Sequence, residues 1–343
     1  MKILLLIIGL LNLFRLGEGN RYQEPTFQVE TKSGIMFAEV KGYWTDMKDE
    51  TPPGRKIRMM DQALDERTLD LRLDLYLPKN DTLSHRPLVM LMHGGSFYYG
   101  SRSDVAITKW CQHLASLGYV AASIDYREGY VPTMENVERA GYRAIQDAHA
   151  ALRYLVAHRE NYGIDTAFIF VGGSSAGAIT ALNLAFMTNE TRPSSTYKSG
   201  KSRDLGNIET SGNNYTNHFS IKGIVDMWGA LSDTSMMQGK NVPILAFHGD
   251  ADDVVPYGYD YPFHKAGWLK KAITQKMFGS YSIVKYAKKH GQQARLYTFE
   301  GYGHSPHRDP DTKALNENFY FIQDKMSAFF FQIITSEKEK ATN

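Results

Sequence analysis

The chain has 343 residues, of which 43% are hydrophobic and 22% are charged, and its formal net charge is +2. This is an ordinary globular composition, and the length allows one large α/β domain or two small ones. The small net charge gives no electrostatic reason to expect nucleic acid as a partner.

The first residues form the pattern of a signal peptide. Lys2 precedes a mostly apolar run over residues 3–14, and Gly17 and Gly19 supply small residues around a cleavage point before Asn20. The run is too short to cross a bilayer comfortably. We therefore predict a signal peptide over residues 1–19 and no stable membrane insertion after its cleavage. A short anchor that stays in place is the alternative.

Cysteine usage bears on the compartment. Cys111 is the only cysteine in the sequence, so an intrachain disulfide is excluded, whereas secreted animal proteins of this size usually carry some. Together with the signal peptide, this favours an exported bacterial protein, secreted or periplasmic. Cys111 lies in an apolar helical stretch and is expected to be a small buried hydrophobe.

The predicted elements begin with antiparallel strands and continue as a strand–helix alternation. Residues 27–30 and 36–43 are expected to form two strands about the Ser33-Gly34 turn, and residues 69–77 show period-two patterning. Further strands are expected at 87–92, 119–126, 167–171, 221–228, 242–247 and 295–299, and helices at 104–117, 137–162, 179–187, 281–291 and 316–334. This order predicts an α/β fold with a mostly parallel central sheet, helices on both faces and an N-terminal antiparallel part.

Residues 20–343 are expected to form a single domain with two insertions. Segment 188–220 is long and polar, and segment 256–280 is rich in aromatic residues. Long loops of this kind are usually functional or mobile. The second segment directly follows a strand, so it should rise over the carboxyl edge of the sheet, where ligands bind in such folds.

The pentapeptide Gly173-Ser174-Ser175-Ala176-Gly177 carries the strongest functional signal. It lies between an expected buried strand and an expected helix, which is the setting of a nucleophile elbow. The turn is so tight that only small residues fit two positions on either side of the serine. Ser175 is therefore the predicted nucleophile, at the N-terminus of a helix whose dipole favours developing negative charge. Ser174 is the rival, but a motif centred on it would place Ala176 where the second glycine belongs.

A serine nucleophile needs a base to take its proton. His304 lies in a glycine-flanked loop between the last expected strand and the last helix, from which its ring can reach the elbow. His307 is the nearest alternative. The His304-x-x-His307 spacing could indicate a metal site, but no third ligand stands at a matching spacing, so no metal is expected.

The base needs an acid to orient it, and three carboxylates follow the strand that ends at Phe247. Asp252 is the predicted acid. Asp250 is expected to brace the turn through an Asx-type bond, and Asp253 to face solvent. His248, at the strand end, is expected to be a packed structural histidine rather than a second base.

Donors for an oxyanion are expected from two backbone segments. One is the amide of Ala176, which directly follows the nucleophile. The other is the glycine-rich loop at residues 93–97, in which Gly95 is the first candidate and Ser96 the second. This loop is not a phosphate-binding loop, because no G-K-[ST] follows it.

Aromatic residues near these loops are candidates for substrate contacts. We expect Phe97, Tyr98, Trp228 and Tyr257 to bind substrate, because they lie beside the catalytic loops or at strand ends. The aromatic residues after Asp252 could instead pack a small cap. The sequence contains no long apolar flap of the kind that a triglyceride lipase uses, so short or aromatic acyl esters are the expected substrates.

The order Ser175, Asp252, His304 resembles the order of the α/β-hydrolases, and the resemblance covers residues 69–334. The loop His93-Gly94-Gly95-Ser96-Phe97 looks like the HGGG-type loop of carboxylesterases and hormone-sensitive-lipase-like enzymes, with Ser96 in place of the third glycine. Ile124-Asp125-Tyr126-Arg127 resembles the family's strand-end segment after that loop.

The resemblance implies an ester hydrolase without a cofactor, acting through an acyl-enzyme on a small-molecule or carbohydrate ester. Similar exported bacterial enzymes include feruloyl and acetyl esterases. Two alternatives remain: a serine peptidase of the prolyl-oligopeptidase type, for which residues 20–68 are too few to form the usual extra domain, and a non-catalytic binding protein on a hydrolase scaffold.

Overall fold

The structure, a computed structural model, describes residues 20–47, 67–198, 202–263, 265 and 274–342. The signal peptide predicted over residues 1–19 lies outside this part. Within the described ranges, no helix is both long and apolar enough to cross a membrane.

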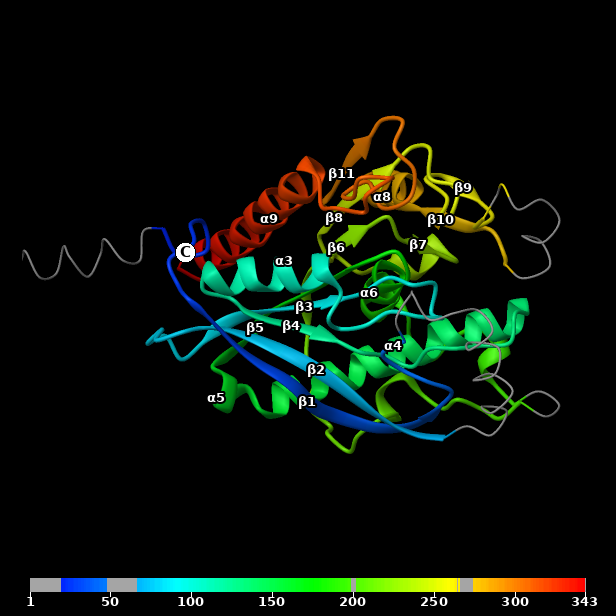
Figure 1. The fold of residues 1–343 in the computed structure, drawn as a ribbon, viewed down its shortest axis with the longest axis horizontal. Helices are drawn as coiled ribbons and strands as arrows, with labels where there is room; N and C mark the ends of the chain where they lie inside the picture. Colours follow the sequence, from blue (N-terminus) through cyan, green and yellow to red (C-terminus); the bar gives the residue numbers. More distant parts are fainter. Residues whose placement is uncertain (1–19, 48–66, 199–201, 264, 266–273, 343) are drawn as a thin grey trace, which may run out of the picture.

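A twisted sheet forms the centre of the described chain (Figure 1). Its strands lie in the order β1-β2-β4-β3-β5-β6-β8-β11. The bounds are β1 (Val29–Gly42), β2 (Arg67–Pro78), β3 (Arg86–Met92), β4 (Val120–Ile124), β5 (Ile164–Ser174), β6 (Ile221–Met227), β8 (Ile244–Gly249) and β11 (Ala294–Phe299). Strand β2 pairs antiparallel with β1 and β4, and the other pairs are parallel. The prediction of a mostly parallel sheet with an N-terminal antiparallel part is confirmed.

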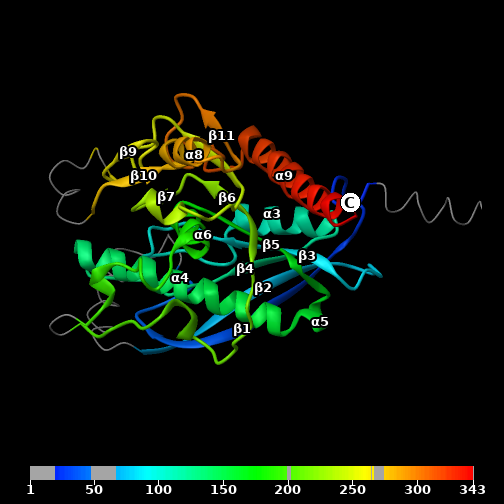
Figure 2. The ribbon, with the colours of Figure 1, turned by 180° about the vertical axis from the view of Figure 1, so that it is seen from behind.

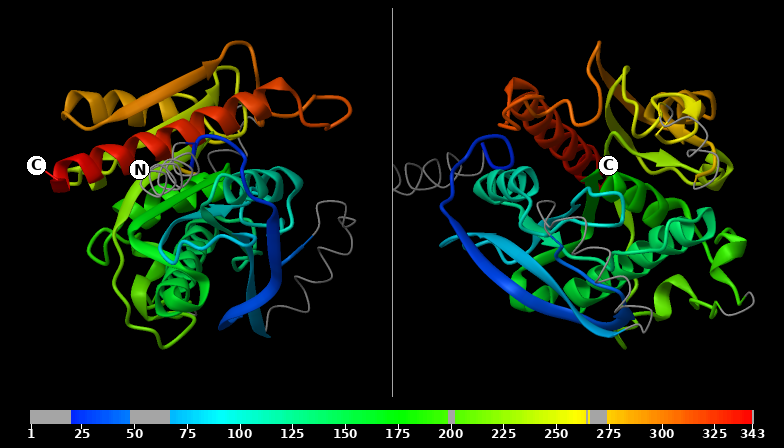
Figure 3. Two further views of the ribbon diagram at one scale, coloured as in Figure 1. Left: turned by 90° about the vertical axis from the view of Figure 1, so that its left-hand side faces the viewer. Right: turned by 45° about the vertical axis from the view of Figure 1, so that its right-hand side comes forward.

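Helices cover both faces of this sheet (Figures 2 and 3). Helices α3 (Val105–Ser116) and α9 (Glu317–Thr342) cover one face, and α4 (Met134–Ala157), α6 (Ala176–Phe186) and α8 (Ser280–Lys289) cover the other. Strand β3 shows why two cores form: Leu88 and Met90 enter the core under α4 and α6, whereas Val89 and Leu91 enter the core under α3 and α9. A strand that is apolar on both faces needs this double cover.

The N-terminal hairpin predicted at residues 27–30 and 36–43 is wrong. The segment forms one long strand, β1, with a register shift between Lys32 and Ile35 in its pairing with β2. Gly34 lies at the shift with φ of 71°, and its N–H donates to Asp74 Oδ1 at 2.7 Å. The Ser33-Gly34 pair therefore makes a bulge rather than a reversal, because a side chain of the neighbouring strand satisfies the amide freed there. The long helix predicted at 137–162 is also divided, into α4 and the short α5 (Arg159–Tyr162).

The two predicted insertions lie on different parts of the fold. The described part of segment 188–220 comes after α6 in the chain, lies against α4 and contains η1 (Ser194–Thr196) and η2 (Ile208–Thr210). Side chains of α4 hold it, since Arg139 donates to Ser195 O at 2.6 Å and Tyr142 donates to Gly206 O at 2.8 Å. In the second segment, β10 (Met277–Gly279) pairs with both β7 (Ala230–Leu231) and β9 (Tyr259–Asp260), which gives a small sheet in the order β7-β10-β9.

Candidate active site

The elbow is built by backbone contacts that admit no side chain. A Cβ on Gly173 would stand 2.6 Å from Met92 O, and a Cβ on Gly177 would stand 2.2 Å from the same atom. Ser175, between them, has φ of 55° and ψ of −119° and stands at the N-cap of α6. Such a strained conformation persists only where the surroundings impose it, and it is typical of active sites. The local sequence thus holds Ser175 at the end of β5, where its hydroxyl faces a cavity.

The structure brings Ser175, His304 and Asp252 into one hydrogen-bonded series. His304 Nε2 lies 2.9 Å from Ser175 Oγ, and His304 Nδ1 lies 2.7 Å from Asp252 Oδ2. Since Asp252 Oδ2 accepts, Nδ1 carries the proton and Nε2 is left free to accept the serine proton. This arrangement can activate a hydroxyl as a nucleophile.

Asp252 is held in an ionised, oriented state. Its Oδ1 accepts from the N–H groups of Val254 and Val255 at 2.8 and 3.0 Å, and its Oδ2 faces His304 and His248. Burial by itself would raise the pKa of Asp252, but the hydrogen bonds from His248 and His304 outweigh it and hold the pKa well below its usual range. The carboxylate therefore stays charged wherever the base must become an imidazolium.

The rival carboxylates have other contacts. Asp250 Oδ1 accepts from Gly301 N–H at 2.7 Å, so it ties the strand-end turn to the loop of His304, instead of making the local Asx-type bond that the sequence predicts. Asp253 forms an exposed ion pair with Lys265 at 2.9 Å. In the described part of the chain, the carboxylate that accepts a hydrogen bond from His304 is that of Asp252, not that of Asp250 or Asp253.

His307, the rival base, is turned away from the elbow. It is buried and stacks on Trp228 with ring centroids 4.8 Å apart. Burial lowers the pKa of His307 to about 3, with the nearby Arg308 contributing, so its ring stays neutral. Its neighbour on the same loop, His304, is the histidine that meets Ser175.

The glycine-rich loop is shaped by positive φ angles. Gly95 has φ of 115°, and a Cβ there would stand 1.6 Å from Tyr99 O, so only glycine fits. Ser96 and Phe97 follow with φ of 56° and 59°, and Ser96 lines the same cavity as Ser175 and Ala176. The structure thus brings two of the three predicted oxyanion donors, Ser96 and Ala176, to the cavity, with Gly95 directly beside Ser96.

The strand-end segment after β4 supports this loop. Tyr126 is buried, and its hydroxyl donates to His93 O at 2.8 Å. The ring of His93 stacks on Tyr126 at 4.2 Å, and its Nδ1–H donates to Gly94 O at 2.7 Å. Burial lowers the pKa of His93 to about 4, so the ring stays neutral. These contacts fix the start of the loop before its glycines.

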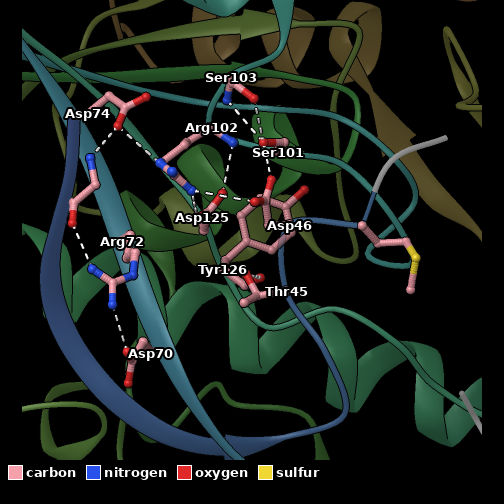
Figure 4. Close-up of polar contacts among 12 residues, drawn as sticks. Thr45, Asp46, Asp70, Arg72, Asp74, Ser101, Arg102, Ser103, Asp125 and Tyr126 are labelled. Carbon is pink, nitrogen blue, oxygen red and sulfur yellow. Dashed lines mark hydrogen bonds and ion pairs between the residues drawn. The ribbon is translucent and has the colours of Figure 1, made fainter. Parts of the chain in front are cut away.

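Arg102 fixes the segment between the glycine-rich loop and α3 (Figure 4). Its Nε donates to Asp74 Oδ1 at 3.0 Å, and its backbone N–H donates to Asp125 Oδ1 at 2.8 Å. Its Nη1 pairs with Asp125 Oδ2 at 2.5 Å and lies 3.8 Å from Asp46 Oδ2. Arg102 therefore ties the chain before α3 to strand β2 and to the end of β4, and this cluster spans three elements that the linear sequence separates.

Of the four residues predicted to bind substrate, Phe97 lines the cavity beside Ser175. Trp228 is fully buried, packs against His307 and meets His304 edge-on at 6.5 Å, so it supports the loop of the histidine from behind. Tyr98 packs edge-on against Trp44 and Tyr130, at 5.2 and 5.3 Å.

Tyr257, the last of the four, lies outside the cavity lining. It stacks on Tyr281 at 5.3 Å, and its hydroxyl lies 2.7 Å from Thr298 Oγ1. In the same segment Phe263 does line the cavity, whereas Tyr259 packs on Phe278 at 4.3 Å. The aromatic segment thus divides between lining the cavity and packing its own small sheet.

The cavity, of about 140 Å³, opens beside Ser175 and runs between helices α4 and α6. Its lining is mostly apolar, and each helix contributes one stripe. Along α6 the stripe is Ala176, Ile179, Asn183 and the C-cap Met187, and along α4 it is Met134, Val137, Glu138, Gly141, Tyr142 and Ile145. Both sets follow helical spacing, so the sequence could indicate that each set shares one helix face. Spacing alone does not show that the two faces meet.

Comparisons with known proteins agree with this site. A family model described as BD-FAE matches residues 73–240, which include the glycine-rich loop and the elbow. Esterase LipI of Mycobacterium tuberculosis is 30% identical over 135 residues, covering 39% of this chain and 40% of that protein. A probable isoprenylcysteine alpha-carbonyl methylesterase, ICMEL1 of Arabidopsis thaliana, is 33% identical over 110 residues, covering 31% of this chain and 20% of that protein. The matches thus span less than half the length of these curated relatives.

Solved structures extend the likeness to nearly the whole chain. Esterase 2 of Thermogutta terrifontis, phosphorylated by paraoxon, has a TM-score of 0.57 at 18% identity and covers 89% of this chain and 94% of that one. A truncated carbohydrate esterase from gut microbiota has a TM-score of 0.55 at 19% identity, covering 91% and 98%. At such identities the likeness establishes the fold. With the parallel sheet and the elbow, the chain has the α/β-hydrolase fold, and part of it is similar to the BD-FAE family model and to curated esterases.

Proposed function

We propose that this chain is a serine esterase, a carboxylic-ester hydrolase that acts through an acyl-enzyme. The observation that carries the proposal is the position of His304 Nε2, 2.9 Å from Ser175 Oγ, at the end of an apolar cavity. The names of the relatives, among them Esterase LipI and Gut esterase 1 of Caenorhabditis elegans, support it.

The proposed reaction follows from the hydrogen-bond partners of the two His304 nitrogens. Ser175 Oγ attacks the ester carbonyl carbon while its proton passes to His304 Nε2, and Asp252 stabilises the imidazolium that forms. Backbone N–H groups at Ala176 and at Gly95 or Ser96 bind the oxyanion. His304 then gives the proton to the leaving alkoxide. In the second half, His304 takes a proton from the water that attacks the acyl carbon and returns it to Ser175 Oγ as the carboxylic acid leaves. No step requires a cofactor.

The cavity indicates the acyl group. Its lining residues along α6 extend from Ala176 to Met187, which corresponds to about 16 Å of helix at 1.5 Å per residue. The walls are mainly apolar, so an acyl chain longer than acetyl, or an aromatic acyl group, gains more burial than acetyl does. For the alcohol part we propose a small molecule or a carbohydrate. One structural neighbour is described as a carbohydrate esterase, and this motivates the carbohydrate arm of the test.

Hydrolysis of a p-nitrophenyl ester series tests the proposal. The series runs from acetate to octanoate. A feruloyl ester and an acetylated oligosaccharide are tested beside it. We expect hydrolysis by the wild type, faster with butyrate or longer chains than with acetate, and a loss in Ser175→Ala of about 10⁴-fold or more. Paraoxon should leave one diethylphosphoryl group on Ser175, detected by peptide mass spectrometry. A folded wild type that hydrolyses no ester would contradict the proposal and favour the peptidase or the binding protein.

Ile179→Phe should shorten the acyl preference. Ile179 lies one helical turn beyond Ser175 and lines the cavity, so a larger ring there occupies the space that a long acyl chain needs. We expect the ratio of octanoate to acetate kcat/KM to fall about tenfold or more, since one methylene in an apolar pocket is worth about 1–3 kcal/mol. Ile179→Val is the matched control and should keep the wild-type ratio or raise it. An unchanged ratio in Ile179→Phe would place the acyl chain elsewhere.

A further inference from the structure

A second histidine lies behind the acid of the triad. His248, near the end of β8, is fully buried, and its Nε2 lies 3.2 Å from Asp252 Oδ2. The same nitrogen lies 3.2 Å from Val255 O. Asp252 Oδ2 thus meets two imidazole rings, that of His304 toward the cavity and that of His248 toward the core.

The neighbours of His248 Nε2 decide where its proton lies. A carboxylate oxygen and a backbone carbonyl oxygen are both acceptors, and neither can donate to an imidazole lone pair. A bare Nε2 would face two buried lone pairs with no hydrogen bond, which is costly. Nε2 therefore carries a hydrogen, shared between Asp252 Oδ2 and Val255 O.

The other side of the ring is held by a hydrogen-bonded chain that leads to another strand. His248 Nδ1 lies 2.8 Å from Ser280 Oγ, at the start of α8, and Ser280 Oγ lies 2.7 Å from Asp226 Oδ2, on β6. Asp226 is fully buried, and its Oδ1 accepts from Gly229 N–H at 2.7 Å. The chain joins Asp226 through Ser280 and His248 to Asp252.

One proton on this chain has two possible places, and both have the same consequence. If it lies on His248 Nδ1, Ser280 accepts it and donates to an ionised Asp226. If it lies on Asp226, that carboxyl donates to Ser280, and Ser280 donates to Nδ1. The single hydroxyl hydrogen of Ser280 faces two acceptors, so a second hydrogen on the chain is needed to complete both hydrogen bonds, and burial raises the pKa of Asp226. In both arrangements the Nε2–H of His248 points at Asp252.

We propose that His248, fixed by Ser280 and Asp226, is a positioning residue for the triad, which orients the Asp252 carboxylate toward His304 and draws off part of its negative charge. The inference rests on the proposed esterase function for its kinetic readout only. The charged and titratable groups around His248 are Asp252, Asp226, the edge of the Tyr257 ring at 5.7 Å, and His304 across the shared carboxylate.

This role makes a signed prediction for the pH profile. Without the Nε2–H donor, Asp252 keeps more negative charge for His304 and favours its imidazolium. The acidic limb of kcat/KM should therefore move to higher pH. Loss of a positive charge on His248 would move the limb in the same direction, so the sign does not depend on which group of the chain holds the proton.

Three variants test the role by kinetics. In His248→Phe we expect kcat to fall about 10- to 100-fold with little change in KM, because the carboxylate loses one of its anchors. The acidic limb should move up by about one pH unit. His248→Gln can place an amide N–H near Asp252, so it should recover kcat and return the limb toward the wild-type position. His290→Gln, at an exposed histidine on the far end of α8, is the control and should match the wild type.

A spectroscopic measurement on the wild type tests for the Nε2 hydrogen of His248 directly, so its result does not depend on whether a variant folds. In ¹⁵N-labelled wild type, histidine ¹H–¹⁵N correlations, assigned by comparison with His248→Gln, should show a protonated Nε2 on His248 between about pH 5 and 9. An unprotonated Nε2 would overturn the inference, and so would a His248→Phe enzyme with the wild-type kcat and acidic limb. If the wild type hydrolyses no ester, the proposed function fails, and the spectrum alone decides whether His248 donates to Asp252.

Discussion

Asp252→Asn should lower kcat by about 10⁴-fold with little change in KM, because the substitution forces the wrong tautomer on the base. The N–H groups of Val254 and Val255 both donate to Oδ1, so the amide oxygen of the asparagine must take that position. The amide NH₂ then stands at the position of Oδ2 and donates to His304 Nδ1. The proton of His304 is left on Nε2, which can no longer accept from Ser175.

The neighbouring carboxylate supplies the matched control for this substitution. Asp253 is one residue away and pairs with Lys265 at the surface. Asp253→Asn makes the same chemical change and should leave kcat unchanged, because exposed ion pairs contribute about 0–1 kcal/mol. Stopped-flow or steady-state hydrolysis of p-nitrophenyl butyrate by the two variants measures the difference. A large loss in Asp253→Asn, with activity kept in Asp252→Asn, would move the acid of the triad to Asp253.

The sequence predicts the fold and the elbow well because both depend on short-range patterns. Continuous apolar strands alternating with helices indicate a parallel sheet whatever the details of its loops. The elbow is equally local, since Gly173 and Gly177 are required by contacts with the end of β3 that any nearby Cβ would violate. The order of Ser175, Asp252 and His304 then leaves few ways to bring them together at one sheet edge.

The cavity lining could not be predicted in the same way. Ile179 on α6 and Val137 on α4 belong to apolar stripes that any amphipathic helix shows, and whether a stripe faces a core or a cavity depends on how the two helices cross. Trp228 is the opposite case, a residue that the sequence predicts to bind substrate and that the structure buries in the core. It follows a strand that ends at the active edge, but its φ of 50° turns the ring into the core behind His304.

Partnerships across the fold explain the remaining differences. The sequence predicts that His248 is a packed structural histidine, and the structure confirms that it is buried. Its contact with Asp252 depends on the turn after β8, which brings the carboxylate four residues later back to the ring. Its further link to Asp226 needs β6, β8 and α8 in their final places. The bulge at Gly34 likewise depends on Asp74 of the next strand. Such contacts are set by tertiary structure, and no local propensity indicates them.

Asp147→Ala should lower the free energy of unfolding by about 3–5 kcal/mol, since it leaves a buried guanidinium with neutral acceptors only and without a compensating negative charge. Arg127 Nη2 lies 2.7 Å from Asp147 Oδ1, and the Arg127 backbone N–H donates to Asp147 Oδ2 at 2.7 Å. The side chains are 5% and 0% exposed, so water cannot replace the lost carboxylate.

The stability measurement separates a buried pair from an exposed one. Glu337→Ala breaks the surface pair with Lys340, which is 74% exposed, and should cost less than about 1 kcal/mol in the same urea titration. Replacing both buried partners, as Arg127→Met with Asp147→Leu, should recover the part of the loss that comes from the stranded charge, whereas the part from the lost acceptor of the Arg127 backbone N–H should remain. If Asp147→Ala costs no more than Glu337→Ala, then the neutral acceptors that already bind Arg127, Lys41 O and Gln146 Oε1 among them, are enough to hold the segment that joins β4 to α4. The distinction matters for the active site, because Arg127 directly follows Tyr126, whose hydroxyl holds the start of the glycine-rich loop.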